Sequence, residues 1–187
     1  KAGEHVPPLG LKYEFLHVCI PFGKDFHRDV RREMGVFDPN YVVVHSTVPV
    51  GTTKKLGFNA AHSPVRGQHD ELDRSIKRFV KYVGGVTPKT TKAVYDHLSS
   101  CGIPVVKWGS PDETELMKNL CLSRYLNDLA YYQVAYELCE KFGVPPSRLF
   151  EWTLTYNDGY RGTGKQRPEL TITYGKQIGN FLSSSPC

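Results

Sequence analysis

The sequence lacks several features that identify common classes of protein. Its five cysteines are odd in number, and none belongs to a Cys-x-x-Cys or Cys/His cluster, so neither a disulfide framework nor a metal site is predicted. No signal peptide and no apolar run of membrane-spanning length occurs, so we expect a reduced, cytoplasmic environment and no membrane partner. The Gly-x-Gly-x-x-Gly pattern of dinucleotide-binding turns is also absent from the 187 residues.

The chain carries only a mild excess of positive over negative charge. The chain has 24 Lys and Arg against 19 Asp and Glu, a formal net charge of +5. The Lys and Arg residues are scattered along the chain. The nearest approach to a basic cluster lies on one predicted helix, at Lys24, Arg28, Arg31 and Arg32. A mild positive balance suits small anionic ligands such as nucleotides, and we expect no nucleic-acid partner.

Short apolar runs alternate with helical patterns through the first 110 residues. Strands are predicted over 16–21, 41–45, 60–62, 80–83 and 103–107, and helices over 25–34, 52–56, 71–79 and 88–100. Strands separated by helices are typical of βαβ units, so the sequence predicts an α/β fold with a mostly parallel sheet. Gly84-Gly85 is expected to form a turn between elements.

A different pattern begins at Asp112. Apolar residues recur every three or four positions as far as Phe142, with no Pro or Gly inside, which predicts one helix over 112–142 of roughly 45 Å. Because this helix is apolar on more than one face, it either joins two domains or builds a dimer interface. A further helix is predicted over 148–155.

The segment 45–53, HSTVPVGTT, directly follows the β-branched run 41–44. In open α/β sheets, ligands collect where the carboxyl ends of strands meet such turns. Hydroxyl groups placed there can hold a nucleotide or position a water molecule. The competing interpretation is that Ser46 and Thr47 only cap the helix that begins near Thr52.

Four segments in a fixed order carry a family resemblance: 18–21 (VCIP), 45–53, 63–69 (SPVRGQH) and 113–118 (ETELMK). The set resembles the UDP-glucose/GDP-mannose dehydrogenase family, which oxidises a nucleotide-sugar alcohol to a carboxylate with NAD in two hydride transfers. Segments 82–85 (YVGG) and 137–144 (ELCEKFGV) also fit, so the resemblance covers about residues 14 to 179.

The resemblance implies a two-part organisation. Residues 1–110 would form the C-terminal half of a Rossmann-like, NAD-binding sheet. Residues 111–187 would form a long central helix and the start of an α-helical substrate and dimerisation domain. A nucleotide sugar would be the substrate, NAD the cofactor, and a second copy of the chain the partner through the 112–142 helix.

The resemblance also implies roles for individual residues. Thr47 would bind the catalytic water, and Lys118 would stabilise negative charge that develops during the reaction, which a fixed cation does well in a low-dielectric cleft. By itself, Lys118 reads as a solvated surface lysine. The implied substrate-binding residues are Arg66, His69, Glu115, Tyr160 and Arg167, and the implied cofactor-binding residues are Pro21, Ser46 and Thr47.

The sequence departs from the family pattern at several functional positions. Val65 stands where the family has a glutamate, Leu122 where it has an asparagine, and Leu182 where it has the nucleophilic cysteine. Leucine cannot form the thiohemiacetal that the second oxidation requires, so we expect little or no activity from these 187 residues. Because the Gly-rich pyrophosphate turn is absent, we also expect weak NAD binding. The alternatives are a β-hydroxyacid dehydrogenase-like enzyme and a non-catalytic dimerisation or nucleotide-binding module.

Overall fold

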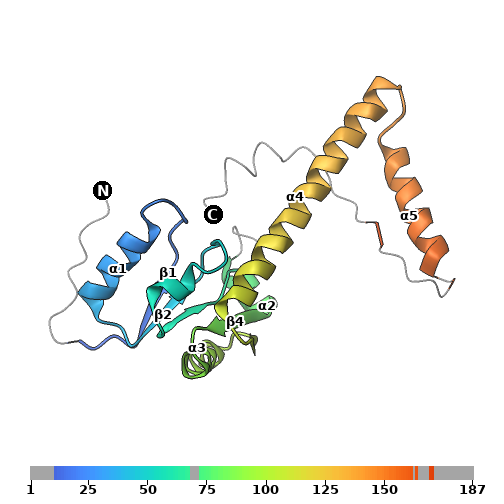
Figure 1. The fold of residues 1–187 in the computed structure, drawn as a ribbon. Helices are drawn as coiled ribbons and strands as arrows, with labels where there is room; N and C mark the ends of the chain where they lie inside the picture. Colours follow the sequence, from blue (N-terminus) through green and yellow to red (C-terminus); the bar gives the residue numbers. More distant parts are fainter. Residues whose placement is uncertain (1–10, 68–71, 162, 164–168, 171–187) are drawn as a thin grey trace. The chain divides into compact units, whose positions relative to one another are not determined.

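The computed structural model describes residues 11–67, 72–161, 163 and 169–170 (Figure 1). The chain divides into two compact units, one reaching to Leu120 and the other beginning at Cys121. The division falls within the long helix α4 (Pro111–Lys141), whose ends lie within one residue of the predicted 112–142 helix. Among the helices of the described residues, none is both long and apolar enough to cross a membrane.

The first unit contains a five-stranded sheet in the order β1-β2-β3-β4-β5. Its strands are β1 (Phe15–Val18), β2 (Tyr41–Val44), β3 (Ala60–His62), β4 (Lys81–Gly85) and β5 (Val105–Lys107). All neighbouring strands are parallel except β3 and β4, which are antiparallel. The predicted α/β fold with a mostly parallel sheet is therefore confirmed.

The helices of this unit alternate with the strands. They are α1 (Phe26–Phe37), the short 3-10 helix η1 (Thr53–Leu56), α2 (Leu72–Arg78) and α3 (Pro88–Ser100). The start of α3 follows the usual rule, because the Thr87 side chain accepts a hydrogen bond from the Thr90 N–H and Pro88 occupies the first turn. The predicted 52–56 helix is only a 3-10 turn, since Gly57 ends it at a φ of 125°.

Both faces of the sheet are buried. Val42 and Val44 point to one face, where they pack with Phe26 and Val30 of α1. Val43 points to the opposite face, whose cluster also holds residues of α3. This alternation along β2 explains why its sequence is an uninterrupted apolar run, as expected for a strand covered by helices on both sides.

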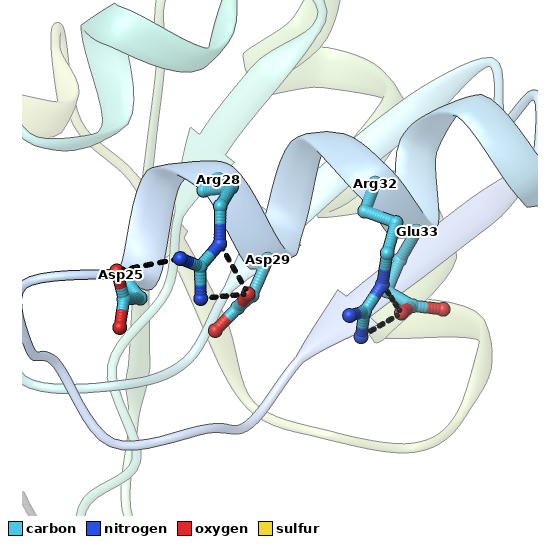
Figure 2. A network of polar contacts seen from close by, with 5 residues as sticks. All are labelled: Asp25, Arg28, Asp29, Arg32 and Glu33. Carbon is cyan, nitrogen blue, oxygen red and sulfur yellow. Dashed lines mark hydrogen bonds and ion pairs between the residues drawn. The ribbon is translucent and has the colours of Figure 1, made fainter.

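Two arginines of α1 are paired with acidic residues of the same helix or of its N-cap (Figure 2). The Arg28 guanidinium lies 2.9 Å from Asp25 and 3.2 Å from Asp29, and Arg32 lies 2.8 Å from Glu33. These pairs are exposed and contribute little to stability. They do offset much of the positive charge that the sequence concentrates on this helix.

Gly84-Gly85 forms the end of strand β4, not the turn that the sequence predicted. A Cβ atom on Gly84 would lie 2.0 Å from the Ser110 carbonyl oxygen, so only glycine allows the backbone before α4 to approach this closely. The glycine therefore positions the start of α4 against the sheet.

The second unit contains the rest of α4 and the helix α5 (Ser147–Arg161). Leu129 and Tyr132 are buried, and Tyr132 lies parallel to Phe150 of α5 with ring centroids 6.5 Å apart. Helix α5 begins one residue before the predicted 148–155 segment and continues to Arg161. In its last turn the Asp158 carboxylate lies 2.7 Å from Arg161, three residues away.

Candidate active site

The turn after β2 is tied to the segment after β1. The Ser46 hydroxyl donates a hydrogen bond of 2.5 Å to the Ile20 carbonyl, next to the exposed Pro21. The Thr52 hydroxyl donates to the Pro49 carbonyl at 2.6 Å, which closes the turn on itself. The carboxyl ends of two neighbouring parallel strands are thus held together, which is where ligands bind in open α/β sheets.

A buried carboxylate of α4 holds the same turn from the other side. One Glu115 oxygen accepts the Gly51 N–H at 2.6 Å, and the other accepts the Thr53 N–H at 2.8 Å. The Glu115 side chain is fully buried. Backbone N–H groups at the start of η1 favour a negative charge, so this carboxylate acts as the cap of the turn. Both oxygens of this predicted substrate-binding residue are therefore engaged with protein.

Two further residues on this face of α4 reach the loops that follow β2 and β3. The Asn119 amide donates to the Val48 carbonyl at 2.8 Å, and the Lys118 ammonium donates to the Val65 carbonyl at 3.0 Å. Glu115, Lys118 and Asn119 share one side of the helix because they are three and four residues apart. The first turns of α4 thus connect segment 45–53 with segment 63–67.

Thr47 and Lys118 are brought to the same edge of the sheet. Thr47 is half-buried, and among the described residues its hydroxyl has no hydrogen-bond partner. Lys118 is also half-buried. A hydroxyl and an ammonium group at this edge are suited to holding an oxygen atom that gains negative charge.

Arg66 is held against the sheet by aromatic rings. Its guanidinium carbon lies 5.4 Å from the Tyr82 ring centroid and 5.9 Å from that of Phe79, and it donates to the Val80 carbonyl at 3.2 Å. Tyr82 in turn packs on Trp108, with centroids 4.3 Å apart. These contacts fix the orientation of a cation that is suited to bidentate recognition of phosphate.

The other predicted substrate-binding residues lie either in the second unit or outside the described residues. Tyr160 belongs to α5 in the second unit, where its ring packs on Tyr156 with centroids 4.8 Å apart. His69 and Arg167 lie outside the described residues. So does Leu182, which stands at the position of the family cysteine.

Sequence reasoning missed a buried polar group beside segment 63–65. The Lys81 ammonium donates to the Ser63 carbonyl at 2.6 Å and to the Pro64 carbonyl at 3.3 Å, and it lies 3.1 Å from His45 Nδ1. Burial lowers the pKa of Lys81 to about 8. Lys81 was missed because its sequence position, at the start of a strand, is typical of a solvated residue.

Two buried histidines next to this group are strongly shifted in pKa. Burial, and next the positive charge of Lys81, lower the pKa of His45 to about 3. Burial lowers the pKa of His62 to about 4, and His62 hydrogen-bonds Thr114 of α4 at 2.7 Å. Titratable groups with strongly shifted pKa values often gather at functional sites. The position of these groups beside the candidate site fits that tendency. In residues 11–67 and 72–161 no group of acidic, His or Cys side chains is arranged to hold a metal ion.

No family model matches the chain, and no curated protein matches it. Solved structures do. A UDP-D-ManNAc dehydrogenase from Pyrococcus horikoshii is 19% identical and has a TM-score of 0.61; the match covers 76% of this chain and 40% of that one. A GDP-mannose dehydrogenase from Pseudomonas aeruginosa is 14% identical with a TM-score of 0.62, over 91% of this chain and 45% of that one.

A 3-hydroxyisobutyrate dehydrogenase from Mycobacterium tuberculosis, solved with L-serine, is 18% identical with a TM-score of 0.55, over 81% of this chain and 52% of that one. The chain spans about half the length of these dehydrogenases or less. At such low identity the likeness shows the fold. The described chain therefore has the fold of part of a dehydrogenase, shared with several nucleotide-sugar dehydrogenases.

Proposed function

We propose that this chain is the portion of a nucleotide-sugar dehydrogenase that carries the charge-stabilising lysine and the substrate loop. The observation that carries the proposal is the set of contacts from α4. Glu115 and Asn119 hold the turn after β2, and Lys118 holds segment 63–67. The same helix therefore organises the two loops that the family resemblance assigns to water and substrate.

Within this proposal each residue has a separate role. Lys118 supplies positive charge where the sugar alcohol becomes a carboxylate, and Thr47 offers a hydroxyl to the reacting water. Arg66 faces phosphate, and Glu115 serves the site by positioning the turn. His69, Tyr160 and Arg167 are proposed as further contacts to the nucleotide sugar.

NAD is the cofactor that this function requires, and it supplies the hydride acceptor. Ser46 and Pro21 lie on the turns proposed to contact it. The described β-to-α turns hold no Gly-rich segment of the kind that cradles a pyrophosphate, so the residues present do not fit a whole dinucleotide.

Ligand binding tests the proposal without requiring turnover. If Lys118 stabilises negative charge at the oxidised carbon, the chain should bind the carboxylate UDP-glucuronate more tightly than the neutral alcohol UDP-glucose. One charge-assisted hydrogen bond predicts a preference of about 10- to 100-fold. Titration calorimetry of both ligands measures it, and Lys118→Ala should remove the preference.

Lys89→Ala, which changes an exposed lysine of α3, is the matched control and should leave the preference intact. Equal affinity of the wild type for both ligands would contradict the role of Lys118. If neither ligand bound at millimolar concentration, the proposed function itself would be contradicted.

A β-hydroxyacid dehydrogenase-like enzyme is the second candidate. The likeness to the 3-hydroxyisobutyrate dehydrogenase favours it, as does Leu182, because hydride transfer from a hydroxyacid requires no cysteine. The same calorimeter separates the two functions, since this candidate binds 3-hydroxyisobutyrate and not a UDP-sugar.

A homodimer through α4 is also proposed. Tyr131, Val134 and Leu138 are 62%, 54% and 49% exposed, and their spacing of three and four residues places them on one face of the helix. Burying such a face contributes about 25 cal/mol per Å² of apolar area. A second copy offers the same face, which suits a twofold interface.

The chain is therefore expected to be a dimer at micromolar concentration by light scattering. Replacing both Val134 and Leu138 with lysine should give a monomer with unchanged helix content. The control Glu140→Lys adds a cation two and a half turns from Tyr131, on the opposite side of the helix, and should stay dimeric. A monomeric wild type would contradict the proposal.

A further inference from the structure

Three imidazoles form a hydrogen-bonded row in the first unit. His45 Nε2 lies 2.9 Å from His17 Nδ1, and His17 Nε2 lies 3.1 Å from His97 Nε2. The ring planes of His17 and His45 are within 4° of parallel, which suits an N–H···N hydrogen bond between them. His17 belongs to β1, His45 directly follows β2, and His97 belongs to α3.

The row runs from the interior to solvent. At its inner end, His45 Nδ1 lies 3.1 Å from the ammonium of Lys81, whose side chain is only 2% exposed. His45 is buried, and the row reaches solvent at its second and third rings, since His17 is exposed on the edge strand of the sheet and His97 is half-buried on α3. Phe15 packs flat on His97, with ring centroids 3.9 Å apart, and so fixes the orientation of the His97 ring.

The same atoms permit two alternative sets of hydrogen bonds. With Lys81 charged, its ammonium donates to His45 Nδ1, His45 Nε2–H donates to His17 Nδ1, and His17 Nε2–H donates to His97. With Lys81 neutral, His45 Nδ1–H donates to the Ser63 carbonyl, 2.7 Å away, and His45 Nε2 accepts from His17. Neutral imidazole has one donor and one acceptor, so all three rings switch together.

We propose that His45, His17 and His97 form a proton path between the Lys81 ammonium and solvent. Lys81 gives a proton to His45 Nδ1, which releases its Nε2 proton to His17 Nδ1. His17 then gives its Nε2 proton to His97 Nε2, and His97 releases its Nδ1 proton to water. Only N–H bonds form and break, and one proton leaves the protein. Imidazole is the usual side chain for such a shuttle.

The charges around the row are consistent with this path. Lys81 interacts with Cys19, which raises its pKa, and with Lys118, which lowers it; burial is the largest effect and brings the pKa to about 8. His45 also interacts with His62 and His17, and its pKa of about 3 means that a proton passes through the ring without remaining on it. Burial is also the main cause that lowers the pKa of His17.

The whole chain, labelled with ¹⁵N at histidine and lysine, tests the path by NMR between pH 6 and 10. His45 should change from the Nε2–H to the Nδ1–H tautomer with the same midpoint as the deprotonation of Lys81. A ¹⁵N–¹⁵N coupling across the His17–His45 hydrogen bond should also be present. If His45 kept one tautomer while Lys81 titrated, the path would be refuted. This measurement needs no variant and no ligand, so it is independent of the proposed function.

Interrupting the row provides a second measurement. In His17→Phe the ring remains aromatic but carries no proton, so exchange of the Lys81 ammonium protons with water should slow by about tenfold or more. The control His27→Phe changes a half-buried imidazole of α1 that bonds the Thr52 carbonyl, outside the row, and should leave the exchange rate unchanged. Unchanged exchange in a folded His17→Phe would overturn the proposal.

Discussion

Acidification from pH 7 to pH 4 is expected to lower the free energy of unfolding of the first unit by several kcal/mol. The pKa values of His45 and His62 are about 3 and about 4 in the folded chain, against 6.5 when unfolded. Below pH 6.5 the unfolded chain therefore binds protons that the folded chain does not. Each unit of pKa separation costs about 1.4 kcal/mol, so the contribution of these two histidines to stability is complete above pH 6.5 and is lost steadily toward pH 4.

Urea denaturation followed by circular dichroism at several pH values measures this loss. Carboxylates also titrate below about pH 5, so the informative comparison is between the wild type and His62→Gln from pH 6.5 to 5. Glutamine keeps polar atoms near Thr114 and the Ser46 carbonyl but does not titrate, so the variant should lose less stability over this interval. Identical slopes for the two proteins would show that His62 is not the buried neutral group described here.

Replacement of Glu115 is expected to have the largest effect of any single change at the candidate site. In Glu115→Ala, the N–H groups of Gly51 and Thr53 lose their charged acceptor in the interior. Leaving one buried and one half-buried donor unsatisfied should lower the free energy of unfolding by about 2–5 kcal/mol. Denaturation in urea at pH 7 measures this change.

Glu113→Ala is the matched control, because Glu113 lies two residues away and is exposed. Among the described residues it accepts a single hydrogen bond, of 3.3 Å, from the Gly109 N–H. Its replacement should change stability by about 0.5 kcal/mol at most. If Glu115→Ala were equally mild, the carboxylate would not be the cap of the turn, and its role in positioning segment 45–53 would have to be abandoned.

Much of the fold was predictable because local patterns determine local structure. The apolar run at 41–44 could bury both faces only as a central strand, and β2 has these bounds. The unbroken recurrence of apolar residues after Asp112 required a long helix, which α4 is. The 3-10 turn at η1 and the strand end at Gly84-Gly85 were not predictable, because a glycine reads as a stop whether it ends a helix or allows backbones to approach.

The candidate site was predictable only in part. The spacing of Glu115 and Asn119 indicates that they share a helix face, but it does not say which loop that face meets. The resemblance led to Lys118 and Thr47, whereas it gave no reason to single out Lys81, His45 or His62. Their importance comes from burial and from partners distant in sequence, such as the bond between His62 and Thr114, which are 52 residues apart.

The sequence by itself determined the α/β class, the order of the elements and the long helix, because hydrophobic period and turn residues act over a few neighbouring positions. Only the tertiary structure decided that β4 runs antiparallel to β3, that α4 holds the loops after β2 and β3, and that three imidazoles align. His17 lies 28 residues from His45 and 80 from His97. Hydrogen bonds between such distant residues depend on how the sheet places its strands, and no local pattern encodes that placement.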